Sequence, residues 1–227
     1  MKILDSLIYY IKIISGGVCV FFTGLLCGID PKNELKYRKA CSRFLTSLIA
    51  KEIIIKGELD KDANILIGNH THNLDIALME TIIKEKIIWI AKKELAKIPI
   101  IKYMVTKTGM ILADRTNKAS IIKMLKEIKT NVDNGYKVIL FPEGTRNKIN
   151  PKKMLPWKKG TQAIIEKLNL KVQPFIIINL PFAFEKNKIK KQKIKVIFLE
   201  SFYPYPNWFE DVQKKMQTIL DKEYNES

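Results

Sequence analysis

Residues 69–75 of this sequence, Asn-His-Thr-His-Asn-Leu-Asp, decide how the rest of the chain is interpreted. They follow the apolar run 64–68, whose length and β-branched content predict a buried strand. The apolar segment 76–79 comes next and begins a helical pattern, whose first turn Asn73 or Asp75 is expected to cap. The stretch is therefore a strand-to-helix turn, where a sheet presents side chains to a cleft.

Both histidines of the chain, His70 and His72, lie in this turn, and His70 precedes the carboxylate of Asp75 by five residues. A neutral imidazole is the usual general base near physiological pH. A carboxylate bound to the other ring nitrogen fixes the tautomer and the orientation of the ring. We therefore predict that His70 is a general base and that Asp75 orients it.

A metal site is the competing interpretation of the same turn. The His-x-His spacing occurs in zinc hydrolases, and Asp75 is available as a third ligand. Such sites need three or four ligands, usually with further histidines, and the sequence has none elsewhere. Its cysteines, Cys19, Cys27 and Cys41, show no Cys-x-x-Cys spacing. We expect no metal, and a metal-dependent hydrolase remains the rival from another class.

The bulk composition describes a basic chain of 227 residues with a net charge of +17, long enough for one substantial core. Such a charge suggests an anionic partner, which can be a nucleic acid, an acidic membrane surface, or an acidic protein or substrate. Alternatively, the lysines simply cover solvated faces. Only four of the 40 basic residues are arginine, which argues against a nucleic-acid-binding module.

Residues 1–30 are predicted to form a hydrophobic membrane anchor, and residues 31–227 the folded domain. The uncharged run 13–29 has 17 residues, at the lower edge of the ~17–25 needed to span a bilayer. Because Gly16 and Gly17 permit a break, we expect two helices that lie in one leaflet as a monotopic anchor, with a single span as the alternative. No cleavage site follows the run, so a cleaved signal is not expected.

Segment 31–50 reads as an amphipathic helix. Its cationic face is expected to lie on anionic headgroups, at about 1 kcal/mol per basic residue near the surface. The residues expected to face inward are Leu35, Cys41, Phe44, Leu45 and Leu48, and the cationic face comprises Lys32, Lys36, Arg38, Lys39 and Arg43.

Beyond this helix, short apolar runs alternate with helical patterns. The expected strands are 52–56, 64–67, 87–91, 109–113, 137–141, 172–178 and 194–199, and the expected helices begin at 76 or cover 117–132, 161–168 and 208–224. This alternation predicts an α/β domain with a mixed, largely parallel sheet flanked by helices.

Two further turns, 109–115 and 141–146, directly follow predicted strands. Because ligands bind beyond the carboxyl ends of strands in open α/β sheets, the three turns are expected to converge on one site. Arg115 and Arg146 lie in these turns, and arginine suits bidentate recognition of phosphate. The sequence has no Gly-x-Ser-x-Gly elbow, Walker A loop or Gly-x-Gly-x-x-Gly loop, which favours direct transfer to a hydroxyl of the substrate.

Four ordered motifs resemble those of the glycerolipid acyltransferases, and among them the bacterial lysophosphatidate acyltransferases. N-H-x-x-x-x-D is matched at 69–75, a glycine with an apolar strand ending in D-R at 109–115, and F-P-E-G-T-R in full at 141–146. The fourth motif, an apolar strand entered through a proline, is matched loosely at Pro174. The chain departs from the family pattern at His72, where serine is common.

This resemblance implies the glycerolipid acyltransferase fold, and transfer of an acyl chain from a thioester to the sn-2 hydroxyl of lysophosphatidate, giving phosphatidate. The catalytic pair would be His70 and Asp75. The residues that would bind the acceptor are Arg115, Glu143, Gly144, Thr145 and Arg146, and those in supporting positions are Asn69, His72 and Pro174. Another lysolipid, such as a lysophospholipid or a lyso-ornithine lipid, remains the alternative acceptor.

The resemblance also implies the partners of the chain. The acyl donor would be acyl-CoA or an acyl-carrier protein, with no further cofactor and no nucleic acid. The protein would bind an anionic phospholipid surface, at the cytoplasmic face of the cell inner membrane.

Overall fold

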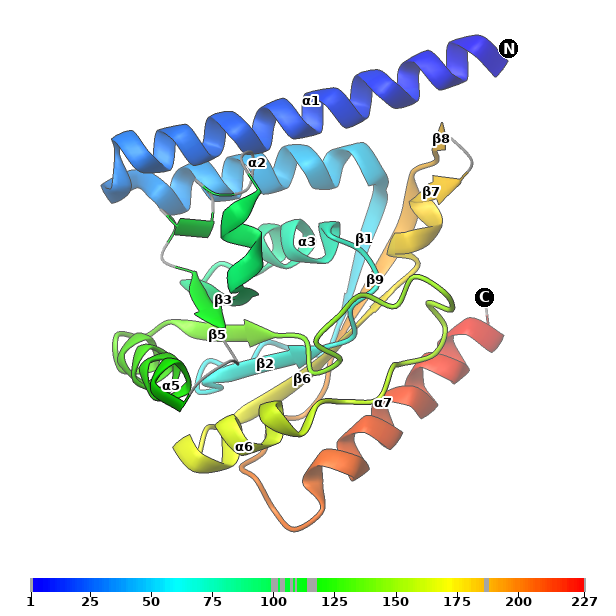
Figure 1. The fold of residues 1–227 in the computed structure, drawn as a ribbon. Coiled ribbons are helices and arrows are strands. Elements are labelled where there is room, and N and C mark those ends of the chain that lie inside the picture. The colour runs from blue at the N-terminus through cyan, green and yellow to red at the C-terminus, as the bar shows by residue number, and fades with distance from the viewer. Residues whose placement is uncertain are drawn as a thin grey trace.

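A seven-stranded sheet with helices on both faces forms the core of the protein (Figure 1). The computed structural model describes residues 2–98, 102, 105–106, 108, 110–113, 118–185 and 188–226, with the side chains of 2–5 and 118 left aside. The strand order is β1-β9-β6-β2-β5-β3-β4. Every neighbouring pair is parallel except β6 and β9, which confirms the predicted mixed, largely parallel sheet.

The seven strands lie close to their predicted positions. Their bounds are β1 (Ala50–Lys56), β2 (Ile65–Gly68), β3 (Ile87–Lys92), β4 (Ile111–Ala113), β5 (Lys137–Leu140), β6 (Val172–Ile178) and β9 (Gln192–Phe198). A two-stranded hairpin, β7 (Phe184–Glu185) with β8 (Lys188–Ile189), lies outside this sheet. Every residue of the central strands β2, β5 and β6 is buried, as expected where both faces of a sheet are covered.

Helices cover both faces of the sheet (Figure 1). On one face lie α2 (Glu34–Ile49) and α3 (Leu74–Ile82), with α1 (Lys2–Ile29) packed over α2 on the side away from the sheet, and on the other face lie α5 (Lys118–Asp133), α6 (Lys159–Leu168) and α7 (Trp208–Asn225). Short 3₁₀ helices are η1 (Pro31–Asn33), η2 (Lys93–Lys97) and η3 (Leu180–Ala183). Successive strand residues supply the two cores in turn: Ile65 and Ile67 face α5–α7, whereas Leu66 faces α2 and α3.

The predicted break in the N-terminal segment is wrong, because α1 is a single helix that runs through Gly16 and Gly17. Gly16 is buried, and a Cβ there would lie 3.2 Å from Leu45 of α2. The missing side chain therefore lets two helices approach closely instead of ending the first one. By length and composition alone, residues Ser6–Ile29 are long and apolar enough to cross a membrane.

The predicted cationic face of segment 31–50 is only partly exposed. Arg38 is buried, and the Lys39 ammonium donates to the carbonyls of Ile83 (3.0 Å) and Lys84 (2.7 Å), at the end of α3. Phe44, predicted to face inward, is 39% exposed. The basic side chains that remain exposed on this segment are Lys32, Lys36 and Arg43.

Gly68, the last residue of β2, is required by the packing beneath the turn that follows. A Cβ at this position would lie 2.3 Å from the ring of Phe175, a fully buried residue of β6. Real Cβ atoms do not approach a ring so closely, so the aromatic ring occupies the space that any other residue would need.

We therefore expect Gly68→Ala to lower the free energy of unfolding by about 1–3 kcal/mol, the range found for overpacked cores. Urea denaturation measures the change. The matched control is Gly160→Ala, since nothing in the described part of the chain lies within 4 Å of a Cβ there beyond its own helix and neighbours. Adding Phe175→Leu to Gly68→Ala should recover part of the loss, and a Gly68→Ala protein as stable as the wild type would contradict this account.

Candidate active site

The turns that follow β2 and β5 meet because these two strands are parallel neighbours, with Ile67 opposite Leu140. Two of the three turns predicted to converge are therefore in contact. The third follows β4, beyond β3 at the edge of the sheet. Arg115 and Gly109, which belong to that third motif, lie outside the described residues, so their convergence on the site stays a prediction.

The structure brings His70 and Asp75 together as the sequence predicts. The imidazole Nδ1 lies 2.8 Å from Asp75 Oδ2. The same oxygen accepts backbone N–H bonds from Thr71 (2.7 Å) and His72 (2.9 Å), and the Asp75 side chain is fully buried. Because Nδ1 donates to the carboxylate, Nε2 carries the lone pair, and this nitrogen is available to accept a proton from a substrate.

The ring of Phe141 fixes the plane of the His70 imidazole. The two rings stack with centroids 3.9 Å apart and an angle of 3° between their planes. The His70 side chain is 14% exposed, so part of the ring remains accessible while the carboxylate and the aromatic ring hold the rest. An imidazole restrained in this way needs little reorganisation to act as a base.

The loop after β5 also holds the backbone of His70 on both sides. The His70 N–H donates to Glu143 Oε1 (2.9 Å), and the His70 carbonyl accepts from the Asn147 N–H (2.8 Å). The second carboxylate oxygen of Glu143 accepts from the Leu155 N–H at 2.9 Å. Each oxygen of Glu143 thus accepts a backbone N–H, so this buried side chain holds the two turns together, and its contact with a substrate stays a prediction.

Asn69 joins the start of the turn to β6. Its Nδ2 donates to the Ile177 carbonyl (2.9 Å), and its Oδ1 accepts from the Ile177 N–H (2.8 Å). A buried amide side chain here replaces one backbone pair of the β2–β6 ladder. Pro174 lies deeper in β6, opposite Ile67, and its carbonyl accepts from the Leu199 N–H.

His72 has a different role from His70. Its Nδ1 accepts the Leu74 N–H (3.2 Å) at the start of α3, and its ring stacks on Phe184 at 4.2 Å. Burial lowers the pKa of His72, so its ring is neutral near pH 7. The prediction that Asn73 or Asp75 caps this helix is therefore wrong. His72 accepts the amide of Leu74 in the first turn of α3, whereas Asp75 accepts the amides of Thr71 and His72 before the helix.

The remaining residues of the second turn lie nearer the surface. Gly144 adopts a positive φ of 66°, and its N–H donates to the Phe141 carbonyl, which closes the turn. Thr145 is exposed and Arg146 half-buried. The positive charge of Arg146 contributes to the lowered pKa of His72, although burial is the larger cause.

No group of three His, Cys, Asp or Glu side chains that would hold a metal ion occurs within the described residues. The Nδ1 atoms of His70 and His72 are both engaged in hydrogen bonds. Because His72 Nδ1 accepts a hydrogen bond, Nε2 carries the proton of this neutral ring, which leaves His72 without a free lone pair for a metal.

The sequence predicts the pairing of His70 with Asp75 but not the groups that hold it. Phe141 was noted only as the first letter of a motif, and Asn147 and Leu155 donate through their backbones, which leaves no side-chain signal. After Leu155 the chain returns to the motif 141–146, because the Lys158 N–H donates to the Pro142 carbonyl (2.9 Å).

Comparison with known proteins places these features in a family context. A family model described as Acyltransferase matches residues 50–178, more than half of the chain and the part that contains both turns. The sequence is 37% identical over 224 residues to 1-acyl-sn-glycerol-3-phosphate acyltransferase of Helicobacter pylori, covering 96% of this chain and 94% of that protein. A protein of the same name from Cocos nucifera is 30% identical over 156 residues, covering 68% of this chain and 50% of its own.

A solved structure shares the fold. The crystal structure of the 1-acyl-sn-glycerophosphate acyltransferase PlsC from Thermotoga maritima matches with a TM-score of 0.74 at 23% sequence identity. The match covers 99% of this chain and 96% of that one.

The buried carboxyl of Glu143 should make stability depend on pH. Burial raises the pKa of Glu143 to about 7 from an ordinary value of 4.5. Between about pH 4.5 and 7 the folded state then holds a proton that the unfolded state has lost, so the free energy of unfolding falls as the pH rises through this window. Above pH 7 the contribution is constant.

We expect Glu143→Gln to remove this dependence, which amounts to up to about 3 kcal/mol. Urea denaturation of both proteins at pH 5, 6, 7 and 8 measures it as the difference between their unfolding free energies. Glu200→Gln, at an exposed carboxylate, is the matched control and should follow the wild type. A difference between wild type and Glu143→Gln that does not change with pH would contradict the assignment.

Proposed function

Because the chain belongs to the acyltransferase family, we propose that it transfers an acyl chain from a thioester donor to the sn-2 hydroxyl of lysophosphatidate, giving phosphatidate. One observation carries the proposal: Asp75 and Phe141 hold the His70 imidazole so that Nε2 is left as the basic atom. The substrate class is supported by the similarity, over nearly the whole chain, to the Helicobacter pylori protein named for this reaction.

In the proposed mechanism, His70 Nε2 removes the proton of the acceptor hydroxyl while the oxygen attacks the thioester carbonyl. Asp75 stabilises the imidazolium that forms, because its carboxylate is fixed by the two amides of the turn as well as by the ring. The tetrahedral intermediate collapses to the new ester, and the departing thiolate takes the proton from His70. No covalent enzyme intermediate is needed.

The glycerol phosphate of the acceptor would be bound by Arg115 and Arg146, with Thr145 and the backbone at Gly144 beside them. Arginine suits this role because its planar fork binds two phosphate oxygens at once. The half-buried position of Arg146, in the loop whose Glu143 and Asn147 bind the backbone of His70, supports its assignment. Glu143 would act indirectly, by holding the loop that carries these groups against His70.

The acyl donor would be acyl-CoA or an acyl-carrier protein, and both present negative charge to a chain of net charge +17. The chemistry at His70 requires no further cofactor. We do not expect nucleic acid as a partner, and another lysolipid is the alternative acceptor.

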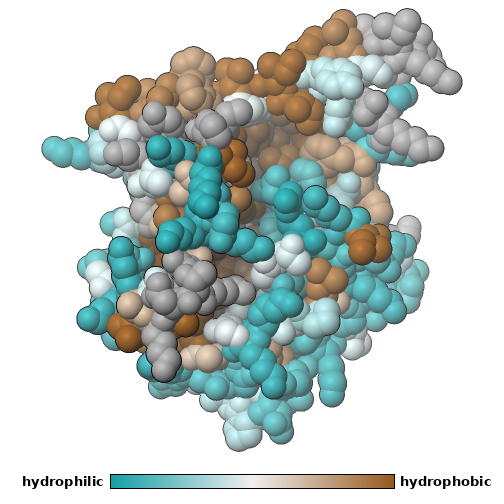
Figure 2. Space-filling view, viewed as in Figure 1, coloured by the Kyte–Doolittle hydropathy of each residue, from teal (hydrophilic) through white to brown (hydrophobic). Residues whose placement is uncertain are grey.

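We further propose that α1 lies in one leaflet of the membrane, at the cytoplasmic face of the cell inner membrane. Large apolar side chains, each at least 43% exposed, recur along one face of α1, at Leu7, Ile11, Ile14, Val18, Phe22, Leu26 and Ile29. Figure 2 shows this hydrophobic band along the top of the molecule. The opposite face of the helix, with Thr23 and Cys27, is buried against the domain. Because a single span would remove α1 from α2, this packing favours the monotopic arrangement.

Acyl transfer by the detergent-purified protein tests the function, with thioester donors and a panel of lysophosphatidate, other lysophospholipids and a lyso-ornithine lipid. We expect a strong preference for lysophosphatidate, and a loss of ~10²–10⁴-fold in His70→Ala, because the base is removed. The activity of Asp75→Asn should fall similarly, since the carboxylate that fixes the tautomer of His70 is lost.

Asn73→Ala is the matched control, because this exposed side chain in the same turn makes no cap hydrogen bond. Retained activity in His70→Ala would refute the base assignment. A preference for another lysolipid would keep the chemistry and change the acceptor, and no transfer to any acceptor would refute the proposal.

The membrane arrangement is tested by placing charges in the exposed band. Ile14→Glu combined with Val18→Glu should abolish binding to vesicles that contain anionic phospholipid, measured by co-flotation, without lowering the unfolding temperature. Ile122→Glu, on the outer face of α5, is the control and should bind as the wild type does. Unchanged flotation of the double variant would show that this face of α1 does not enter the bilayer.

A further inference from the structure

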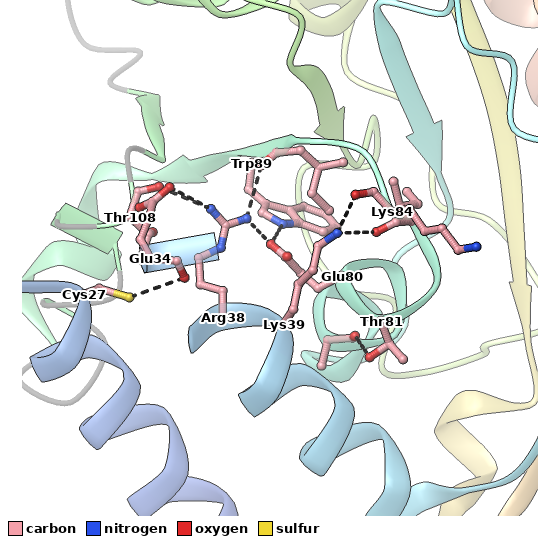
Figure 3. Close-up of polar contacts among 12 residues, drawn as sticks. Cys27, Glu34, Arg38, Lys39, Glu80, Thr81, Lys84, Trp89 and Thr108 are labelled. Carbon is pink, nitrogen blue, oxygen red and sulfur yellow. Dashed lines mark hydrogen bonds and ion pairs between the residues drawn. The ribbon is translucent and has the colours of Figure 1, made fainter. Parts of the chain in front are cut away.

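A buried ionic cluster behind the active site centres on Arg38 of α2, which is 3% exposed (Figure 3). Its Nη2 binds Glu80 Oε1 of α3 and donates to the Ile87 carbonyl (3.2 Å) at the start of β3. Its Nη1 donates to the Thr108 carbonyl (3.4 Å) and lies 3.6 Å from Glu34. One guanidinium thus joins α2 to α3, to β3 and to the segment before β4.

Glu80 extends this cluster to the sheet. Its Oε1 also accepts the indole N–H of Trp89 in β3 at 3.0 Å, as Figure 3 shows. Its Oε2 is buried and has no hydrogen-bond partner within the described part of the chain. Glu80 and Asp75 belong to the same short helix, α3, so whatever holds Glu80 also holds the helix that carries the catalytic carboxylate.

Trp89 connects the cluster to the catalytic ring. Its ring stacks on Phe141 with centroids 5.7 Å apart and an interplanar angle of 28°. Phe141 in turn stacks on His70, with ring centroids 3.9 Å apart. Contacts therefore run without interruption from Arg38 through Glu80, Trp89 and Phe141 to the imidazole.

Stability alone is a poor explanation for this arrangement. Removing two charges from water is so unfavourable that well-packed apolar residues of similar volume often stabilise a fold equally well or better. Apolar residues, however, cannot fix the orientation of the groups that they contact. The planar fork of an arginine binds several acceptors at fixed angles, and here the acceptors come from α3, β3 and the segment before β4.

We propose that Arg38 is a positioning residue for the transfer reaction. By holding Glu80 and the carbonyls of Ile87 and Thr108, it sets the position of Trp89 and Phe141 behind His70. This inference rests on the proposed role of His70 as the base. Because the contacts from Arg38 lead to the base and not to a group that binds a substrate, its loss should lower kcat more than it changes KM.

The first test is Arg38→Lys, which keeps the positive charge beside Glu80 but not the fork. Well below the unfolding temperature, we expect kcat to fall about tenfold, with KM for donor and acceptor within twofold of the wild type. Arg43→Lys is the matched control, because it makes the same change at an exposed position of the same helix and should leave both constants unchanged. An unchanged kcat in Arg38→Lys would overturn the proposal.

A double variant separates positioning from stability. Arg38→Met alone would leave the buried Glu80 carboxylate uncompensated, so we combine it with Glu80→Gln, which removes that charge and retains an acceptor for the Trp89 indole. We expect the unfolding temperature to return towards that of the wild type while kcat stays low. A kcat that recovers together with the unfolding temperature would show that the cluster only stabilises the fold.

A spectroscopic readout is independent of the reaction. In ¹⁵N-labelled protein, the indole N–H resonance of Trp89, assigned with Trp89→Phe, should shift in Arg38→Lys and remain unchanged in Arg43→Lys. An unshifted resonance in Arg38→Lys would overturn the positioning role even if the transfer activity were confirmed. A wild-type protein that transfers to no acceptor, with the resonance shifted as expected, would instead refute the proposed function.

Discussion

The three hydrogen bonds accepted by Asp75 Oδ2 are the interaction on which the rest of the structure depends. Two come from amides of the turn and one from His70 Nδ1, so a single buried oxygen fixes both the backbone of the turn and the tautomer of the base. A buried carboxylate is tolerated only when it is hydrogen-bonded in this way. The fold of the turn and its chemistry therefore have the same physical origin.

The sheet supplies the second constraint, because neighbouring parallel strands bring two turns from distant parts of the sequence together. Glu143 and Asn147 then bind the N–H and the carbonyl of His70. Phe141 also stacks on the His70 ring, and Trp89 of the Arg38 cluster stacks on Phe141 in turn. An imidazole held from several elements is pre-organised, which is the property that its proposed role as the base requires.

Most of the fold could be predicted from periodicity, and the errors have physical causes. The strands were found because β2, β5 and β6 are buried on both faces and read as continuous apolar runs. The break at Gly16 was mispredicted because glycine permits a bend without requiring one, and the packing of α1 on α2 uses its small size instead. The exposure of Arg38 was mispredicted because a charged side chain at helical spacing gives no sign of a buried partner on another helix.

The sequence by itself determined the class of fold, the pairing of His70 with Asp75 and the motif that follows β5, because each of these depends on residues close together in the chain. Only the tertiary structure decided what holds them. Three sets of contacts join segments up to 73 residues apart: the backbone amides on both Glu143 oxygens, the aromatic rings behind His70, and the carbonyls that Arg38 binds. Backbone groups carry no side-chain identity, so no local pattern distinguishes an amide that holds a catalytic residue from any other.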